Sequence, residues 1–326
     1  MRAARCETYG APSDIVISDL PDPEAGPGEV VVDIAAAALN FPDVLTIADK
    51  YQVSTPVPFT PGSEFAGRIS AIGEGVSGFA VGDRVMGSAG VGAFAEKIAV
   101  SESALFEIPE GLDMVHAAGF RVTYQTAYHS LVTVGGVTEN DWVVVLGAAG
   151  GVGSATVDVA SRLGARVIAA ASTRDRVQLG RDLGAVEGIA YGEEDLKSRI
   201  KEITGGGADL VIDPVGGPYA EQALRAIRWG GTFLTVGFAA GEIPRIPLNL
   251  VLLKNVIVRG FEIRSIGTHL PDAAEQATRT LAELVADGMS PLVTDIFSLD
   301  DAGKALAMVA DRQATGKIVI RMKSDS

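Results

Sequence analysis

Residues 147–153 read Gly-Ala-Ala-Gly-Gly-Val-Gly and have the composition of a loop that binds phosphate. The residue pattern predicts a strand at 142–146 before this segment and a helix over 151–163 after it. Glycines let backbone amides approach a pyrophosphate, and the N-terminus of a helix adds partial positive charge. Gly150 and Gly153 match the second and third glycines of the GxGxxG fingerprint, with alanine in place of the first. A tight turn without a ligand is the alternative, but the flanking elements favour a dinucleotide site.

The next expected strand, residues 166–171, indicates which dinucleotide is bound. A site for NAD normally ends this strand with Asp or Glu, which holds the ribose 2′-hydroxyl. Here the strand is followed by Ser172, Thr173 and two arginines, Arg174 and Arg176. Hydroxyl donors and positive charge suit a 2′-phosphate, so the pattern favours NADPH. The alternative is that Ser172 or Thr173 caps the following helix and that the arginines are solvated.

The composition argues against several classes of partner. The formal net charge is −14, and a field of this sign repels nucleic-acid phosphates and acidic lipid surfaces. Charges such as Asp158 and Lys254 interrupt the apolar stretches, so no membrane span is expected. Residues 1–14 lack the apolar region of a secretory signal. The single cysteine, Cys6, rules out an internal disulfide and a multi-thiolate zinc site, and a reducing cytoplasm is the expected location.

The elements that position the glycine turn divide the chain into two parts. A length of 326 residues is more than one core usually holds. Short runs of β-branched residues between glycine-containing turns predict strands at residues 30–36, 65–72, 84–86 and 94–100. We therefore expect the first part to be a β-rich, partly barrel-like domain.

From residue 141 onward, strands alternate with helices. Strands are predicted at 142–146, 166–171, near Ile189, and at 210–213, 232–236 and 256–261, and helices at 151–163, 173–183, 194–204 and 219–228. This alternation predicts an α/β fold with a doubly wound parallel sheet. A polar helix at 273–287 and a last strand at 317–322 do not continue it. The expected organisation is a domain at 1–121, completed by 266–326, with a nucleotide-binding domain inserted at 122–265.

Several motifs carry a resemblance to a known family. They are residues 38–43 (ALNFPD), 61–67 (PGSEFAG), 73–85 (GEGVSGFAVGDRV), 122–128 (VTYQTAY), 147–153 (GAAGGVG) and 213–217 (DPVGG). Along essentially its whole length the chain resembles the zinc-independent NADPH:quinone oxidoreductases of the medium-chain dehydrogenase/reductase superfamily. This resemblance implies a GroES-like β-rich domain that carries an inserted Rossmann domain with a doubly wound parallel sheet.

The resemblance also implies which residues bind NADPH. The pyrophosphate would contact Gly150, Gly151 and Val152, the 2′-phosphate Ser172, Arg176 and Tyr191, and the nicotinamide half Gly237, Phe238 and Ala239. Asn40 and Thr126 would line the place where cofactor meets acceptor, and Lys317 would be a further basic cofactor contact. Arg176 replaces the usual lysine of the family, which keeps the positive charge and adds a forked set of donors.

The zinc ligands of the alcohol dehydrogenases in this superfamily are missing from the corresponding positions. Ser63 replaces the histidine, Ala118 lies near the position of the later cysteine, and the region of the first cysteine reads Asn-Phe-Pro-Asp at residues 40–43. Without a Lewis acid, a simple ketone lacks its main stabiliser during hydride transfer. A quinone or an α,β-unsaturated carbonyl spreads the incoming charge, so a conjugated acceptor is expected.

Two residues are candidates for catalysis. Tyr51 is similar in position to the tyrosine proposed as proton donor in related enoyl-thioester reductases, and Asn40 could orient the substrate or the nicotinamide. The alternatives are that Tyr51 only packs the wall of the site, that Asn40 only satisfies loop backbone, and that solvent supplies the proton. Arg121 is interpreted as part of a salt bridge at the domain boundary, with contact to an anionic acceptor as the alternative.

Three functions remain open at this stage. The leading hypothesis is an NADPH-dependent reductase of quinones or similar small electrophilic acceptors. An enoyl-CoA, enoyl-thioester or alkenal reductase is the second, and a protein that binds NADPH without turnover is the third. Asn40 and Tyr51 favour an enzyme. The family often dimerises through an edge strand of the Rossmann sheet, which would be residues 256–261 here, so a homodimer is expected.

Overall fold

A computed structural model describes residues 1–322, and the chain divides into two compact units. Unit 1 comprises Met1–Val122 and the chain from Ser290 onward, and unit 2 comprises Thr123–Met289. The sequence predicts a return to the first domain at residue 266, whereas the return begins at Ser290. The reason is that helix α10 (Pro271–Ala286) belongs to unit 2, where Thr278 accepts a hydrogen bond from the Gln125 side chain (3.2 Å).

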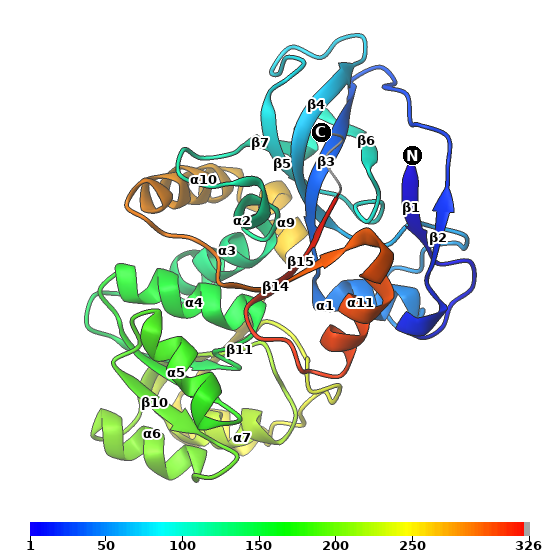
Figure 1. The fold of residues 1–326 in the computed structure, drawn as a ribbon. Coiled ribbons are helices and arrows are strands. Elements are labelled where there is room, and N and C mark those ends of the chain that lie inside the picture. The colour runs from blue at the N-terminus through cyan, green and yellow to red at the C-terminus, as the bar shows by residue number, and fades with distance from the viewer. Residues whose placement is uncertain (323–326) are drawn as a thin grey trace. The chain divides into compact units, whose positions relative to one another are not determined.

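Unit 1 is built on a seven-stranded sheet that contains strands from both ends of the chain. The strand order is β14-β15-β3-β4-β5-β7, and β6 pairs with β3 beside this path. The strands are β3 (Glu29–Ala38), β4 (Glu64–Ile72), β5 (Arg84–Ser88), β6 (Lys97–Ser101), β7 (Leu105–Glu107), β14 (Val293–Ser298) and β15 (Lys317–Arg321). Strand β15 pairs antiparallel with β3, so the red end of the ribbon lies beside the blue strand β3 (Figure 1).

A two-stranded sheet and short helices complete unit 1. They are β1 (Arg2–Arg5), β2 (Val16–Asp19), α1 (Phe41–Ile47), α2 (Met114–Ala118) and α11 (Ala302–Ala310), with 3₁₀ turns η1 (Pro12–Asp14), η2 (Glu102–Ala104) and η4 (Leu299–Asp301). The predicted strand at 94–100 begins only at Lys97. The residues before it contact the N-terminal strand instead, since the Phe94 carbonyl accepts a hydrogen bond from the Ala4 amide (2.8 Å).

Unit 2 contains six parallel strands in the order β10-β9-β8-β11-β12-β13. They are β8 (Trp142–Leu146), β9 (Arg166–Ala171), β10 (Glu187–Ala190), β11 (Ala208–Asp213), β12 (Ile227–Thr235) and β13 (Ile257–Gly260). The first strand in the chain is central, and the order reverses between β8 and β11. This is the doubly wound Rossmann arrangement, so the predicted α/β fold class is confirmed.

Helices cover both faces of this sheet. They are α4 (Gly151–Arg162), α5 (Arg174–Asp182), α6 (Leu196–Thr204), α7 (Pro218–Arg225) and α8 (Leu248–Lys254); α3 (Arg121–Tyr128), a π-helix (η3, His129–Val134) and α9 (Ile263–His269) lie outside this alternation. On one face α4 packs against α5, and on the other α6 packs against α7. The four successive residues Val143, Val144, Val145 and Leu146 of β8 are therefore all buried, which explains the apolar run in the sequence.

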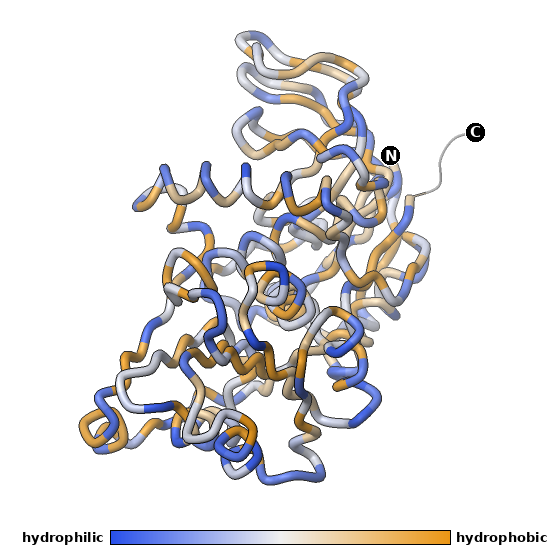
Figure 2. The backbone as a smooth tube through the Cα atoms, turned by 90° about the vertical axis from the view of Figure 1, so that its left-hand side faces the viewer, coloured by the Kyte–Doolittle hydropathy of each residue, from blue (hydrophilic) through white to orange (hydrophobic). Residues whose placement is uncertain are grey.

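Two helices show how local pattern and packing combine. The predicted helix at 219–228 ends at Arg225, because Ile227 already pairs with Ala208 in the sheet. Along α10 the tube alternates between hydrophilic and hydrophobic colours (Figure 2), and its buried residues are Ala277, Leu281 and Val285. Within residues 1–322, no helix has the length and apolar character needed to cross a membrane.

Candidate functional site

The turn between β8 and α4 has the conformation that the glycine pattern predicts. Gly147 has a φ of +60°, and a Cβ on Gly153 would lie 2.0 Å from the Gly147 carbonyl oxygen, so neither position accepts a side chain without movement. A Cβ on Gly150 would meet only the Gly147 oxygen, at 3.4 Å. Gly150 is the N-cap of α4, and the amides of Gly151 and Val152 lie in the first helical turn, which offers them no intrahelical acceptor. The open space at Gly150 fits a phosphate group bound by these amides.

The residues after β9 agree in part with the alternative interpretation, in which a hydroxyl side chain caps the next helix and the arginines are solvated. Thr173 is the N-cap of α5, and its hydroxyl accepts a hydrogen bond from the Arg176 amide at 3.4 Å. Arg174 is exposed and pairs with Glu193 at 2.8 Å. Arg176 differs from Arg174 because its side chain is half-buried. Of these two arginines that follow β9, Arg176 is thus the more buried.

The structure brings Ser172, Arg176 and Tyr191 together. The Tyr191 amide donates to the Ala171 carbonyl (2.9 Å), and a Cβ on Gly192 would lie 2.4 Å from the Ser172 carbonyl oxygen. The ends of β9 and β10 are therefore adjacent. Burial raises the pKa of the Tyr191 hydroxyl to about 12, while the Arg176 charge acts in the opposite direction. At neutral pH, Tyr191 is a neutral hydrogen-bond donor beside a cation, a combination that suits a phosphate.

Tyr219 is a neighbour of this group that the sequence did not single out. Its ring lies 4.1 Å from the Tyr191 ring, centroid to centroid, with an angle of 40° between the planes. Tyr219 is the second residue of α7, so it reaches the group from the other side of the central strand. The contact fixes the ring of Tyr191 and thereby limits the positions of its hydroxyl.

Unsatisfied polar atoms lie at the carboxyl edge of the sheet. Asp213, the last residue of β11, is fully buried, and its Oδ1 accepts the amides of Val215 (2.9 Å) and Gly216 (2.8 Å). Within residues 1–322, its Oδ2 has no hydrogen-bond partner, nor has Oγ1 of Thr235, which lies opposite it on β12. Burial raises the pKa of the Asp213 carboxyl. Atoms of this kind are normally satisfied by ordered water or by a ligand.

The predicted nicotinamide segment lies at the same edge. The Gly237 amide donates to the Asp213 carbonyl (3.3 Å), and the Ala239 amide donates to the Pro214 carbonyl (3.2 Å). The loops after β11 and β12 are therefore joined by backbone hydrogen bonds, and Phe238 lies between the two bonded residues. Ligands of doubly wound sheets bind at this carboxyl edge, near the point where the strand order reverses.

Unit 1 contains a buried polar cluster of its own. Glu64, at the start of β4, accepts hydrogen bonds from the Asn40 amide group (3.1 Å) and the Lys317 ammonium (3.2 Å) through Oε2. Its Oε1 accepts from the Val122 amide at 2.7 Å. Asn40 precedes α1, and Lys317 begins β15, so segments far apart in the sequence meet here. Glu64 accepts all of these hydrogen bonds and is therefore the centre of the cluster.

Lys317 differs from its expected role as a cofactor contact. Its side chain is only 3% exposed, and Nζ donates to the Leu39 carbonyl (2.9 Å), Asn40 Oδ1 (2.8 Å) and Glu64 Oε2 (3.2 Å). An ammonium has three N–H donors, and the protein accepts all of them. The lysine therefore balances the buried Glu64 charge and has no donor left for a cofactor.

Asp43 is a further member of this cluster and contacts Asn40. Its Oδ2 accepts the Asn40 backbone amide at 2.7 Å, and the Ser63 hydroxyl also donates to its carboxylate. Burial raises the pKa of the Asp43 carboxyl to about 6, and the hydrogen bonds only partly oppose this effect. Asn40 is thus fixed through both its backbone and its side chain, so part of its role is structural.

Tyr51 and Thr126 lie in different units. Tyr51 is half-buried in the loop after α1 of unit 1, and Thr126 is buried in the part of α3 that belongs to unit 2. The candidates for catalysis, Asn40 and Tyr51, therefore belong to unit 1. Apart from Asn40 and Lys317, the predicted cofactor residues belong to unit 2.

The positions of the expected zinc ligands are occupied by other chemistry. Ser63 donates to Asp43, and Ala118 is a buried residue at the end of α2. Throughout the described chain, no group of three or more His, Cys, Asp or Glu residues could hold a metal ion. The charge that faces Glu64 is supplied by Lys317.

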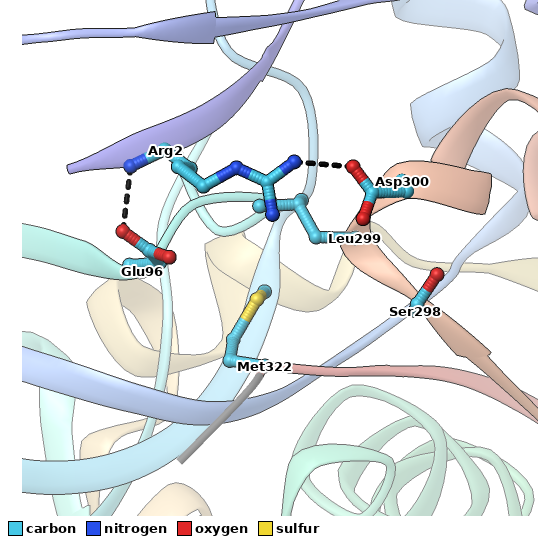
Figure 3. Close-up of a pocket in the computed structure, with 6 residues that line it drawn as sticks. All are labelled: Arg2, Glu96, Ser298, Leu299, Asp300 and Met322. Atoms are coloured by element: carbon cyan, nitrogen blue, oxygen red, sulfur yellow. Dashed lines mark hydrogen bonds and ion pairs between the residues drawn. The ribbon is translucent and has the colours of Figure 1, made fainter. Parts of the chain in front are cut away.

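A small pocket of unit 1 contains none of the predicted site residues. Figure 3 shows its lining, which is Arg2, Glu96, Ser298, Leu299, Asp300 and Met322. The Arg2 guanidinium pairs with Asp300, and the Arg2 amide donates to Glu96 at 2.6 Å. Because these charged groups already bind one another, the pocket adds nothing to the candidate site.

Comparison with known proteins establishes the family. Residues 26–110 match the model of the alcohol dehydrogenase GroES-like domain, and residues 151–283 match that of the zinc-binding dehydrogenases. The chain is 35% identical to the quinone oxidoreductase-like protein 2 homolog of Nematostella vectensis, over 99% of this chain and 89% of that protein. The chain belongs to the quinone oxidoreductase-like family. This family lies in the medium-chain dehydrogenase/reductase superfamily of oxidoreductases.

Solved structures of this superfamily share the fold over almost the whole chain. The quinone oxidoreductase from Thermus thermophilus, solved also in complex with NADPH, is 34% identical with a TM-score of 0.86 and covers 98% of this chain and 100% of its own. A structure described as an NAD-dependent alcohol dehydrogenase is 29% identical with a TM-score of 0.92, covering 99% and 100%. These two similar proteins differ in the cofactor that their descriptions name.

Proposed function

We propose that this quinone oxidoreductase-like protein transfers hydride from NADPH to a quinone or another conjugated carbonyl acceptor without zinc. The observation that carries the proposal is the group of Ser172, Arg176 and Tyr191 at the ends of β9 and β10. No carboxylate ends β9, and the half-buried arginine lies beside a neutral phenol. Such a group suits a 2′-phosphate and leaves the 2′-hydroxyl of NADH without its usual acceptor. The Thermus relative, which was solved with NADPH, supports the same cofactor.

The other cofactor contacts follow the edge of the unit 2 sheet. The amides of Gly151 and Val152, with the open space at Gly150, would hold the pyrophosphate. Gly237, Phe238 and Ala239 would lie beside the nicotinamide half, and Thr126 would complete its surroundings. Lys317 is omitted from this set because all its donors are used within unit 1.

The residues of unit 1 would stabilise the reduced acceptor. Bound NADPH supplies the hydride. Asn40 has one N–H directed to Glu64 and its oxygen bound by Lys317, so the plane of the amide is fixed and its second N–H is a candidate donor to the acceptor oxygen. Tyr51 is the proposed proton donor, with solvent as the alternative source.

Metal independence is supported by the residues at the expected ligand positions. Ser63 and the segment at 40–43 are engaged with one another through Asp43, and Lys317 supplies the positive charge beside Glu64. Metal analysis of the purified protein should find no stoichiometric zinc, and NADPH oxidation should survive a chelator. Loss of activity with EDTA and its recovery with zinc would contradict this part of the proposal.

Three acceptors test the reaction class. Oxidation of NADPH should be measured with 1,4-benzoquinone, with an alkenal and with crotonyl-CoA. The proposal predicts efficient turnover of the quinone or the alkenal. Turnover confined to crotonyl-CoA would identify an enoyl-thioester reductase, and tight NADPH binding without any turnover would identify a non-catalytic binding protein.

A homodimer is also proposed, formed through the edge of the unit 2 sheet. Strand β13 ends the sheet, and all four of its residues are exposed. The preceding helix α8 exposes Leu248, Leu252 and Leu253, each by more than two thirds. An open strand edge next to exposed leucines suits pairing with a second copy of the chain.

A further inference from the structure

Arg121 is a half-buried cation that the proposed function does not use. It begins helix α3, immediately before Val122, whose amide donates to Glu64 at 2.7 Å. The Arg121 guanidinium carbon lies 3.1 Å from the centroid of the Phe106 ring on β7. The arginine therefore stands beside the Glu64–Asn40 cluster, in the unit that carries the proposed acceptor residues.

The salt bridge expected for Arg121 is not found in the described chain. Within residues 1–322, the guanidinium has no ion pair or hydrogen bond, and its contact is the stack on Phe106. Glu64 is the carboxylate whose charge acts on it, but the Glu64 oxygens are bound by Val122, Asn40 and Lys317. Burial lowers the pKa of Arg121 to about 10, so the side chain remains charged at neutral pH.

This arrangement has the chemistry of an anion contact. Stacking uses one face of the planar guanidinium and fixes its plane, but leaves its N–H edges available for a bidentate bond to a carboxylate or a similar group. A half-buried cation that forms no ion pair within the described chain is unfavourable for the free protein, and a bound anion would compensate for it. The chain as a whole is acidic, with a net charge of −14, so long-range attraction of anions does not provide this selectivity.

We infer that Arg121, stacked on Phe106, binds an anionic group carried by the electron acceptor. The inference rests on the proposed function, because it specifies the acceptor of that reaction. A single arginine suits one compact anion, such as a carboxylate or sulfonate attached close to the conjugated system. It would act as a specificity residue, and the hydride transfer itself does not require it.

Paired acceptors that differ in charge test the inference. One pair is 1,4-naphthoquinone and 1,4-naphthoquinone-2-sulfonate. The other is crotonyl-CoA and the crotonyl thioester of N-acetylcysteamine, which lacks the phosphates. In Arg121→Gln, kcat/KM should fall by about 10-fold or more for an anionic member and stay within about twofold for its uncharged partner. Comparing each variant with the wild type cancels the intrinsic reactivity of the acceptors, and the pair that responds shows whether the anion is compact or part of a phosphate tail.

Arg68→Gln is the matched control, because Arg68 is an exposed arginine of the same unit and its loss changes the net charge equally. In Arg68→Gln, the ratio of kcat/KM for the anionic acceptor to kcat/KM for the uncharged acceptor should equal that of the wild type in both pairs. Equal losses for charged and uncharged acceptors in Arg121→Gln, or a matching loss of NADPH affinity, would overturn the inference.

Direct binding separates this inference from the reaction. The naphthoquinone pair should be titrated into the protein by calorimetry without NADPH. Tighter binding of the sulfonate by the wild type, lost in Arg121→Gln, supports the anion contact even if no acceptor is reduced, in which case only the proposed function fails. Equal binding of both quinones by the two proteins contradicts the contact, and turnover of the uncharged quinone would then leave the proposed function intact.

Discussion

Arg174 and Arg176 follow the same strand, yet their environments differ, and we propose different roles for them. Arg174 is exposed and paired with Glu193, whereas Arg176 is half-buried beside the Tyr191 hydroxyl. The sequence alone places both arginines near a possible 2′-phosphate. The structure separates them, because the distinction depends on the adjacency of β9 and β10.

Replacing Arg176 by alanine should weaken NADPH binding by about 1.5–3 kcal/mol, the range for hydrogen bonds to charged groups. NADH affinity should change little, because NADH has no 2′-phosphate. Fluorescence titration of both cofactors measures the difference. Arg174→Ala is the matched control and should alter NADPH affinity by less than about 1 kcal/mol, as expected for an exposed ion pair. An equal loss for NADPH and NADH in Arg176→Ala would count against the assigned role.

Asp43 should make the stability of unit 1 depend on pH. Its folded pKa of about 6 lies above the ordinary value of 3.8, so the native state binds the proton more tightly than the unfolded state. The contribution of the protonated Asp43 carboxyl to the free energy of unfolding is therefore fully present below about pH 4 and is lost as the pH rises through about 6. Urea unfolding from pH 4 to pH 7 should show the wild type losing about 2–3 kcal/mol relative to Asp43→Asn. The Asn variant keeps an acceptor for the Asn40 amide, and parallel pH profiles of the two proteins would show that the carboxyl is not perturbed.

Residue identities predict only part of the site. The glycines of the turn could be found because their spacing is a property of the chain itself. The role of Lys317 could not be predicted in this way, because its three acceptors belong to Leu39, Asn40 and Glu64, which are far from it in the sequence. Tyr219 was missed for the same reason: its partner Tyr191 is on another element, and no local pattern indicates the contact.

At the scale of elements, the strand–turn–helix of β8 and α4 has two glycines with different requirements. A Cβ on Gly153 would lie 2.0 Å from the Gly147 carbonyl oxygen, while a Cβ on Gly150 would have its only close neighbour at 3.4 Å. Gly153 is therefore needed for the packing of the helix on the turn. Gly150 is needed only if a ligand occupies the space in front of it.

This difference gives a matched pair of variants. Gly153→Ala should lose about 1–3 kcal/mol of stability, as for overpacking, together with NADPH binding. Gly150→Ala should fold with nearly the stability of the wild type and lose NADPH affinity. Thermal unfolding and NADPH titration measure the two effects. Wild-type affinity in Gly150→Ala would show that no pyrophosphate lies against this residue.

Elements buried on both faces were the most predictable. The bounds of β8 and β9 match the predicted strands because their apolar runs need no knowledge of the rest of the fold. The unit to which α10 belongs could not be predicted from the sequence, because the apolar face of the helix indicates burial but does not indicate the unit on which it packs. The predicted return at residue 266 failed for this reason, and the return begins at Ser290.

At the scale of the whole molecule, the edge strand β13 should determine the oligomeric state. Val258 is 47% exposed on this edge, and a lysine there should oppose strand pairing with a second copy. Sedimentation velocity should show a wild-type dimer and a Val258→Lys monomer. Val186→Lys is the control, because Val186 is 53% exposed next to β10, at the opposite edge of the sheet, and should leave the dimer intact. A wild type that is monomeric at every concentration would contradict the proposed interface.

The account depends most directly on which cofactor the protein binds when no metal is added. NADPH and NADH should be titrated into the purified chain in the presence of EDTA, with binding followed by nucleotide fluorescence. We predict one NADPH bound per chain, with an affinity at least about 10-fold above that for NADH, which corresponds to about 1.4 kcal/mol. Equal affinity for the two nucleotides, or no binding of either one without added metal, would contradict the account.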